Sequence, residues 1–313
     1  MGRSAIGIDV GGTKVAGVLV DEDGRVVSSR TEPTPADDVE ATMETVFRVA
    51  EGLRDEGAPS GVGIGAAGMV DHATGILRWA PNLAWQEVPI GERVSDRLGL
   101  PCVVDNDANA AAWAEFRFGA GQGFRYVLVV TVGTGIGGGL VVDGALARGA
   151  HGFAAEVGHV IVEPDGPVCG CGNRGCWEQV ASGRALDRLG REAAREQPSS
   201  LLARVAGGRD VTGAMVAEAA GRGDRASMDI LHRVGQRLGE GLAGLVNTLD
   251  PEAVVVGGGV AEMGDLLLDP AREAFARTVE APEHRPDVPI LPAKLGNEAG
   301  AVGAAALALD ATA

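Results

Sequence analysis

The chain contains the same short pattern twice: a hydrophobic strand, a glycine turn, and a second strand that ends in an Asp/Gly turn. The first copy spans Ala5–Gly24, with its glycine turn at Gly11–Thr13, and the second spans Tyr126–Gly144, with Gly133–Gly135. Alternating hydrophobic residues on both sides of such turns indicate strands. Because no low-complexity linker separates the copies, we expect two similar α/β domains that pack against each other, with a small ligand in the cleft between them.

Hydrophobic periodicity predicts the remaining elements in a mixed α/β order. The further strands are expected at Arg25–Arg30, Val62–Ala66, Cys102–Val104, Ala253–Val256 and Val288–Leu291. The helices are expected at Asp37–Glu56, Asp107–Phe118, Glu178–Arg195, Asp210–Leu249 and from Glu298 onward, with a short helix after Pro89. A polar segment rich in Gly and Pro, between Ala66 and Pro89, is expected to form turns.

Composition narrows the class of protein. The 313 residues are 45% hydrophobic and 22% charged, as in ordinary globular proteins. A net charge of -16 argues against nucleic acid as a partner. The start of the chain lacks the features of a signal peptide, and no apolar run approaches the ~18 residues that span a bilayer. We therefore expect a cytoplasmic enzyme without a membrane partner.

Three of the four cysteines lie in the stretch HVIVEPDGPVCGCGNRGCWEQ, residues 159–179. His159, Cys169, Cys171 and Cys176 supply the four ligands of a closed, structural zinc site. A redox role would require Cys-x-x-Cys, and a nucleic-acid finger would require a basic surround. Glu156 and Glu178 flank the cluster, so zinc would fix them with His159 as hydrogen-bonding groups suited to a polyhydroxylated ligand.

Glycine turns offer candidate phosphate sites. Gly63–Gly68 and Gly133–Gly138 match G-x-G-x-x-G, but neither opens a helix, so the dinucleotide-binding interpretation fails. Backbone amides of a hairpin turn can instead surround an anion. Each turn alone is equally well a tight hairpin, but the repeat and a third run at Gly257–Gly259 favour phosphate binding. Asp9 is either a strand-end cap or a carboxylate that orders the waters of Mg²⁺, and Lys14 either neutralises phosphate or is solvated.

Asp107 lies where a strand ends and a helix begins. It is either the N-cap of that helix or a carboxylate that accepts a proton during phosphate transfer to an alcohol. Asn106 beside it has both a donor and an acceptor for a second hydroxyl. The residues alone do not separate the two interpretations.

Together these motifs resemble the ROK family of sugar kinases, over nearly the whole chain. The resemblance rests on DVGGTK at 9–14, WAPNLAW at 79–85, DNDAN at 105–109, VGTGIGGGLVVDG at 132–144, EVGH at 156–159, CGCGNRGCWE at 169–178 and GGGV at 257–260. It implies a duplicated actin-like ATPase fold of the ribonuclease H-like type, with two domains around a cleft. The implied small domain is 1–107 joined by the helix 298–313, and the large domain is 108–297 with the zinc loop.

The resemblance also implies transfer of the γ-phosphate of ATP to the 6-hydroxyl of glucose, with Mg²⁺, a structural Zn²⁺ and Asp107 as general base. The implied sugar contacts are Asn82, Asn106, Asp107, Glu156, His159 and Glu178. The implied nucleotide contacts are Asp9, Gly11, Gly12, Thr13, Lys14, Thr134, Gly135, Gly137, Gly138, Gly257, Gly258 and Gly259. The zinc ligands are the same His159, Cys169, Cys171 and Cys176, and a homodimer or homotetramer is expected.

Two alternatives stay open at this point. One is a ROK kinase for N-acetylglucosamine, N-acetylmannosamine or fructose, although WAPNLAW most resembles the glucokinase branch. The other is a sugar-sensing regulator without activity; because DVGGTK begins at residue 9, no DNA-binding domain is expected ahead of it. Ala155 departs from the family pattern, which usually has Gly before the Glu, and predicts a stiffer backbone there.

Overall fold

The structure is a computed structural model that describes residues 2–80 and 82–313. It divides into two compact units. The first comprises Met1–Val129, Gly138–Ala155 and Ala293–Ala313, and the second comprises Val130–Gly137 and Glu156–Pro292.

A five-stranded sheet in the order β3-β2-β1-β4-β8 forms the centre of the first unit. Its strands are β1 (Ser4–Val10), β2 (Lys14–Asp21), β3 (Val26–Pro33), β4 (Val62–Ala66) and β8 (Cys102–Asn106). β1, β4 and β8 run parallel, so their carboxyl ends meet at one edge of the sheet. In this register Asp9 pairs with Gly65, and Gly65 pairs with Asp105.

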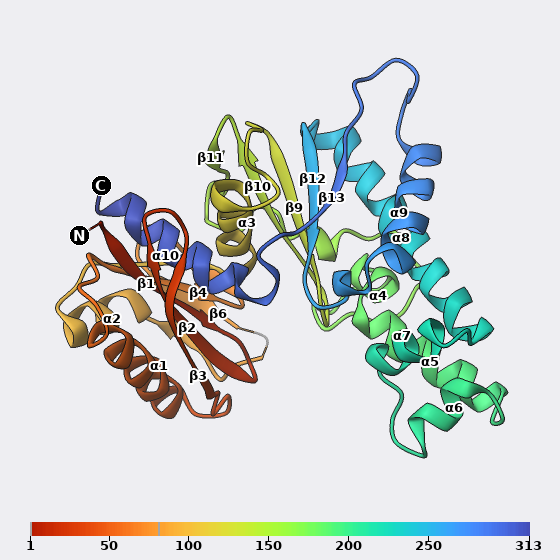
Figure 1. Cartoon of the computed structure of the whole chain (residues 1–313), viewed down its shortest axis with the longest axis horizontal. Coiled ribbons are helices and arrows are strands. Elements are labelled where there is room, and N and C mark those ends of the chain that lie inside the picture. Colours follow the sequence, from red (N-terminus) through yellow and green to blue (C-terminus); the bar gives the residue numbers. More distant parts are fainter. Residues whose placement is uncertain (1, 81) are drawn as a thin grey trace. The chain divides into compact units, whose positions relative to one another are not determined.

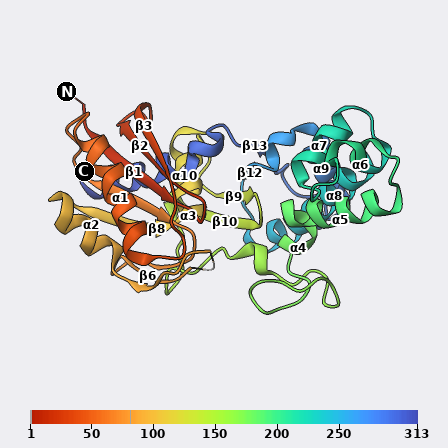
Figure 2. The same ribbon diagram turned by 90° about the horizontal axis from the view of Figure 1, so that it is seen from below.

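Helices cover both faces of this sheet (Figures 1 and 2). On one face, Ile6, Ile8 and Val10 join the core formed with α1 (Val39–Arg54) and α2 (Ile90–Leu98). The opposite face packs against α10 (Ala299–Ala311), which in turn packs against α3 (Asp107–Phe118).

Glycine permits the close approach between β1, β4 and α10. A Cβ on Gly7 would lie 1.9 Å from the carbonyl oxygen of Ala301, and one on Gly63 would lie 1.7 Å from that of Ala304. No side chain fits at these distances. The glycines of β1 and β4 therefore let the backbone of α10 pack directly against the sheet.

The segment expected to form turns contains a three-stranded antiparallel sheet, so that expectation was wrong in part. Its strands are β5 (Met69–Asp71), β6 (Ile76–Trp79) and β7 (Gln86–Val88). They are short, and turn residues such as Gly75, with φ of 67°, separate them. Turn composition dominated the sequence pattern and hid the alternation of the strands.

The second repeat forms a sheet in the order β11-β10-β9-β12-β13. Its strands are β9 (Val127–Val132), β10 (Ile136–Val142), β11 (Ala145–Leu146), β12 (Ala253–Gly257) and β13 (Ile290–Pro292). The helices of the second unit are α4 (Glu178–Ala181), α5 (Gly183–Glu196), α6 (Leu201–Ala206), α7 (Gly213–Gly221), α8 (Arg225–Leu249) and α9 (Asp265–Thr278). Single 3₁₀ turns lie at η1 (Val157–His159), η2 (Ala261–Met263) and η3 (Gly296–Glu298).

Two helices predicted as continuous are interrupted. The one expected from Glu178 is broken at Ser182, whose hydroxyl caps α5 by accepting from Arg184 N. The one expected over Asp210–Leu249 is broken at Gly223, with φ of 85°, and at Asp224, which caps α8. Both breaks use local capping that hydrophobic periodicity does not register.

The first unit extends past residue 107, where the sequence placed the domain boundary. The buried carboxylate of Glu115 on α3 accepts hydrogen bonds from the backbone amides of Ala120, Lys294 and Leu295. This anchors the segment that leads into α10 to α3, and both helices belong to the same unit.

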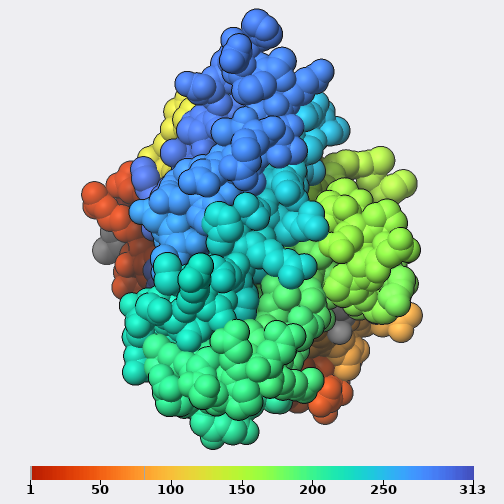
Figure 3. Space-filling view, turned by 90° about the vertical axis from the view of Figure 1, so that its right-hand side faces the viewer, coloured from red at the N-terminus to blue at the C-terminus, as the bar shows by residue number. Residues whose placement is uncertain are grey.

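Among the described residues, no helix combines the length and apolar character needed to cross a membrane. The face in Figure 3 consists largely of helices of the second unit, coloured green to blue. The cysteine loop is also at the surface, where Val168 is 64% exposed.

Candidate active site and metal cluster

The carboxyl edge of the first sheet brings two carboxylates close together. Asp9 is the penultimate residue of β1, and Asp107 is the first residue of α3, directly after β8. Gly65 pairs with Asp9 in the sheet, and a Cβ on it would lie 3.5 Å from the Cα of Asp107. Burial, and secondarily the charge of Asp107, raise the pKa of Asp9 to about 7, while Lys14 lowers it. A partly buried carboxylate beside a second carboxylate fits a functional site and gains from a nearby cation.

Asn106, not Asp107, caps α3. Its Oδ1 accepts hydrogen bonds from Ala108 N at 2.9 Å and Asn109 N at 3.1 Å, and its Nδ2 donates to the carbonyl of Gly68 at 3.0 Å. The capping interpretation of Asp107 is thus not needed. The acceptor of Asn106 is used within the protein, and its amide donates to Gly68 O and to the Asp107 carboxylate, so a ligand hydroxyl would have to share these groups. Burial raises the pKa of Asp107, and hydrogen bonds from its own amide, Ala108 and Asn106 oppose the shift.

The Gly11–Thr13 turn lies against the Asn82 loop. A Cβ on Gly12 would lie 3.0 Å from both the Cβ and the carbonyl oxygen of Asn82. Thr34 fixes the turn: its hydroxyl donates to Gly11 O at 2.7 Å and its amide donates to Thr13 O at 3.1 Å. A predicted phosphate loop and a predicted sugar contact are therefore neighbours within the first unit.

The Thr134–Gly135 turn is fixed to the start of α5. Ser182 Oγ donates to Thr134 O at 3.0 Å, and Gly183 N donates to Gly133 O at 2.9 Å. The third glycine run packs beside this turn, because Gly258 has φ of 87° and Val260 N donates to Val132 O at 2.9 Å. Two of the three predicted phosphate loops thus adjoin within the second unit.

The cysteine loop gathers the four predicted ligands. The ligand atoms of His159, Cys169, Cys171 and Cys176 all lie within 4.8 Å of one another. The Sγ atoms of Cys171 and Cys176 are 3.6 Å apart, and Cys169 Sγ lies 3.7 Å from His159 Nδ1. Zn–S bonds of about 2.3 Å at tetrahedral angles place sulfur atoms roughly 3.8 Å apart. The donor set and its spacing fit a zinc ion.

Glu178 connects this cluster to the Thr134–Gly135 turn. Its Oε1 accepts from the Cys169 thiol and from Gln179 Nε2, each at 3.0 Å. Its Oε2 lies 2.3 Å from where a Cβ on Gly135 would be. The side chain is 9% exposed, so its orientation is set by these neighbours.

The predicted residues fall into two groups. Asp9, the Gly11–Lys14 turn, Asn82, Asn106, Asp107 and Gly138 are in the first unit. Glu156, the zinc ligands, Glu178, Thr134–Gly137 and Gly257–Gly259 are in the second. Pro81, which lies in the WAPNLAW motif, is outside the described residues.

Comparison with known proteins assigns the family. Residues 5–311 match the sequence model of the ROK family. The chain belongs to the ROK family. It is 45% identical to a glucokinase of Streptomyces coelicolor, over 97% of each chain. A crystal structure of a ROK family glucokinase from Streptomyces griseus, in complex with glucose and AMPPNP, superposes with a TM-score of 0.90 at 44% identity, covering 98% of this chain and 99% of that one. A putative xylose repressor of Caldicellulosiruptor is 33% identical over 97% of this chain and 78% of its own.

Ala155 has an unusual backbone conformation for a residue other than glycine. The residue has φ of 66°, in the left-handed region where glycine is favoured. The position thus has a backbone conformation that glycine adopts freely, and here an alanine is held in it immediately before Glu156.

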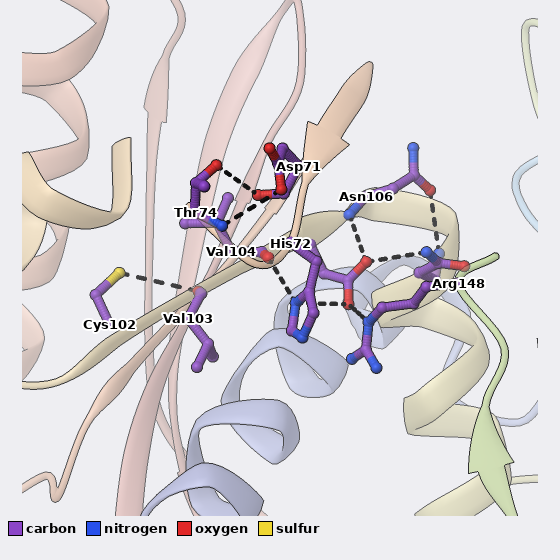
Figure 4. Close-up of polar contacts among 10 residues, drawn as sticks. Asp71, His72, Thr74, Cys102, Val103, Val104, Asn106 and Arg148 are labelled. Carbon is purple, nitrogen blue, oxygen red and sulfur yellow. Dashed lines mark hydrogen bonds and ion pairs between the residues drawn. The ribbon is translucent and has the colours of Figure 1, made fainter. Parts of the chain in front are cut away.

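The sequence missed two residues of this site. Asp105 is almost fully buried, and its Oδ2 accepts from Arg148 Nε at 2.6 Å (Figure 4). Asp105 entered the sequence analysis only as part of the DNDAN motif, in which roles were assigned to Asn106 and Asp107. Arg148 lies 43 residues away in sequence, in a stretch without periodicity, so no signal linked the two.

Proposed function

We propose that this chain is an ATP-dependent glucokinase that transfers the γ-phosphate of ATP to the 6-hydroxyl of D-glucose. The observation that carries the proposal is the pair of Asp9 and Asp107 at the carboxyl edge of the first sheet, with capping of α3 assigned to Asn106. Glucokinases at this level of identity over the full chain support the same reaction.

Asp107 is the general base of this proposal. Phosphate transfer to an alcohol depends chiefly on positioning and on electrostatic stabilisation, and a carboxylate that takes the hydroxyl proton assists it. Burial raises the pKa of Asp107, which makes its carboxylate a stronger proton acceptor than an exposed Asp. The 6-hydroxyl oxygen forms a bond to the γ-phosphorus and gives its proton to Asp107, while the bond from the γ-phosphorus to the bridging oxygen breaks and its electron pair leaves with ADP.

The glycine turns are the proposed phosphate contacts. A Cβ on Gly259 would meet no atom within 4 Å, so phosphate oxygens can approach the backbone there, and Lys14 adds a positive charge. Asp9 would hold Mg²⁺, which neutralises charge on the phosphates. The fit rests on Asp9 itself, because a partly buried carboxylate close to the charge of Asp107 favours a divalent cation.

The proposed sugar contacts are Asn82, Asn106, Asp107, Glu156, His159 and Glu178. Zinc would bind His159 and the three cysteines, as thiolates, and would keep the loop that precedes Glu178 rigid. The zinc in this proposal has a structural role, since four protein ligands complete its coordination.

Sugar phosphorylation by the wild type and by Asp107→Asn tests the proposal. Glucose, mannose, fructose, N-acetylglucosamine and N-acetylmannosamine are supplied with Mg·ATP, and sugar binding is measured separately by calorimetry. Turnover of glucose in preference to the others, lost in Asp107→Asn with sugar binding retained, supports a glucokinase. Preferred turnover of an N-acetylated sugar or fructose would assign another hexose kinase. Sugar binding without turnover in the wild type would favour a sugar sensor instead.

A further inference from the structure

The two carboxylate oxygens of Asp105 have different partners: Oδ1 accepts from the start of α3, and Oδ2 accepts from Arg148. Its Oδ1 accepts from Asn106 N and from Asn109 Nδ2, each at 2.9 Å. Its Oδ2 accepts from Arg148 Nε at 2.6 Å, and His72 Nδ1 lies 3.7 Å from the same oxygen (Figure 4). Asp105 therefore joins Arg148 to the turn that presents Asp107.

The orientation of Asn109 depends on this carboxylate. Asn109 is buried, and its Oδ1 has no hydrogen-bond partner among the described residues. The bond from its Nδ2 to Asp105 is thus the contact that fixes the side-chain amide. The other donor to Asp105 Oδ1 is the backbone amide of Asn106, the residue that caps α3.

Arg148 is itself held in place by its surroundings. Its carbonyl oxygen accepts from Ala154 N at 3.0 Å, which closes the strap formed by residues 148–154. Gly152 of this strap packs so closely on β5 that a Cβ would lie 2.5 Å from Val70 O. The guanidinium therefore approaches Asp105 from a fixed backbone, and its charged hydrogen bond is of the strong, directional kind.

We propose that the Arg148–Asp105 ion pair positions the catalytic base, with Arg148 acting through Asp105 on the first turn of α3. Arg148 is a positioning residue, because its described contacts are with Asp105 and with its own strap and none reaches Asp107. The inference rests on the proposed role of Asp107 as base. The hydrogen bonds from Asn106 N and Asn109 Nδ2 to Asp105 hold the turn that carries Asp107, and so keep its carboxylate in one orientation. Small misplacements of a reacting group slow the chemical step strongly.

The competing explanation is that Arg148 only neutralises a buried charge. Arg148→Met does not separate the two, because it leaves Asp105 buried and unpaired. The double variant Asp105→Leu/Arg148→Met does separate them. It replaces the pair by apolar side chains of similar size, which restores stability in many buried pairs, but it removes the acceptor for Asn106 N and Asn109 Nδ2.

The experiment measures kcat, the KM values for glucose and ATP, and the urea midpoint of the two variants and the wild type. We expect kcat to fall by about tenfold to a hundredfold in both variants, with KM for ATP changed by less than about threefold. The urea midpoint should fall in Arg148→Met and recover only in part in the double variant, because Asn106 N and the buried Asn109 Nδ2 lose their acceptor there. Recovery of kcat together with the midpoint, or wild-type kcat in Arg148→Met, would overturn the proposal. If Arg148→Met does not fold, the double variant alone decides by the same kcat criterion.

Two controls accompany it. Arg78 lines the same cavity of about 380 Å³ as Arg148 but pairs with Asp71 and Glu87, so Arg78→Met should keep wild-type kcat. Asp107→Asn is measured in parallel. If it is inactive while the variants of the pair are fully active, only this inference fails; if it is active, the proposed base itself is wrong.

Discussion

The carboxylate of Glu178 occupies the space where any side chain on Gly135 would begin. Its Oε2 lies 2.3 Å from an ideal Cβ at Gly135, and its Oε1 accepts the Cys169 thiol. The second unit thus places a turn proposed to hold phosphate next to a carboxylate proposed to hold sugar, and this carboxylate next to a proposed zinc ligand. The absence of a Cβ at Gly135 is a steric condition for the present position of Glu178.

Gly135→Ala should therefore displace Glu178. Overpacking at a buried contact costs about 1–3 kcal/mol, and roughly 1.4 kcal/mol corresponds to tenfold in an equilibrium or rate. We expect kcat/KM for glucose to fall by about tenfold or more, measured by steady-state kinetics at saturating ATP.

Gly244→Ala is the matched control for this substitution. A Cβ at Gly244, in α8, meets no atom within 4 Å, so the change should leave kinetics intact and slightly favour the helix. Equal losses in both variants, or none in Gly135→Ala, would mean that the contact with Glu178 does not constrain the site.

Asp9 predicts a dependence of stability on pH. An unfolded Asp ionises near 3.8, whereas folded Asp9 keeps its proton until about pH 7, chiefly because it is buried. Between these values the unfolded chain binds fewer protons, so this group makes the free energy of unfolding fall as pH rises through the interval. Asp9→Asn should then be more stable than the wild type at pH 8 without Mg²⁺ or nucleotide, and the gap should shrink at pH 5.

Urea titrations of both proteins at the two pH values measure this effect. Activity provides the second readout, because Asp9→Asn should lose ATP turnover if Asp9 serves Mg²⁺. A stability difference that is the same at pH 5 and pH 8 would contradict the raised pKa of Asp9, whatever the activity.

The parts of the site that sequence reasoning found share one property: their signal is local. Cys169, Cys171 and Cys176 lie within eight residues, and the donor set alone indicates zinc. The glycine turns repeat between strands whose alternation is plain. Even so, the sequence could not decide whether Asp107 is the helix cap, because the answer depends on the backbone of Asn106, whose φ of -65° and ψ of 146° make it the cap instead.

The features that were missed depend on contacts between distant segments. Arg148 reaches Asp105 from a strap whose sequence has no periodic pattern, and the amides of Lys294 and Leu295 reach Glu115 from near the end of the chain. A buried ion pair becomes visible only when packing shows that both partners are away from water. The strands β5 to β7 were missed for another reason, since they are too short for alternation to outweigh their turn residues.

Cys171→Ser should weaken zinc binding and then sugar binding. Cys171 is the exposed member of the cluster, so its loss opens one coordination position without creating a cavity in the core. We expect a lower zinc content by metal analysis and a raised Kd for glucose by calorimetry, with nucleotide affinity changed less. Chelation of the wild type should reproduce the effect.

The fourth cysteine supplies the control for the zinc prediction. Cys102 is on β8, outside the cluster, and Cys102→Ala should keep full zinc content. Equal loss of glucose and nucleotide affinity in Cys171→Ser would indicate general unfolding and would contradict a local role for the metal.

Ala155 offers a test of backbone strain next to a proposed sugar contact. Its φ of 66° places an alanine in the left-handed region, which costs about 1–2 kcal/mol relative to a right-handed conformation. Glycine avoids this cost but makes the unfolded chain more flexible, by about 0.5–1 kcal/mol. Ala155→Gly should therefore raise the free energy of unfolding by about 0.5–1 kcal/mol.

The neighbouring Ala154 provides the control. It is not among the residues with positive φ, so Ala154→Gly carries only the flexibility cost and should lower the free energy of unfolding by a similar amount. Opposite signs in urea unfolding of these adjacent variants support strain at Ala155. The same sign in both would show that the strap accommodates the alanine without cost, and that the glycine usual in the family is kept there for another reason.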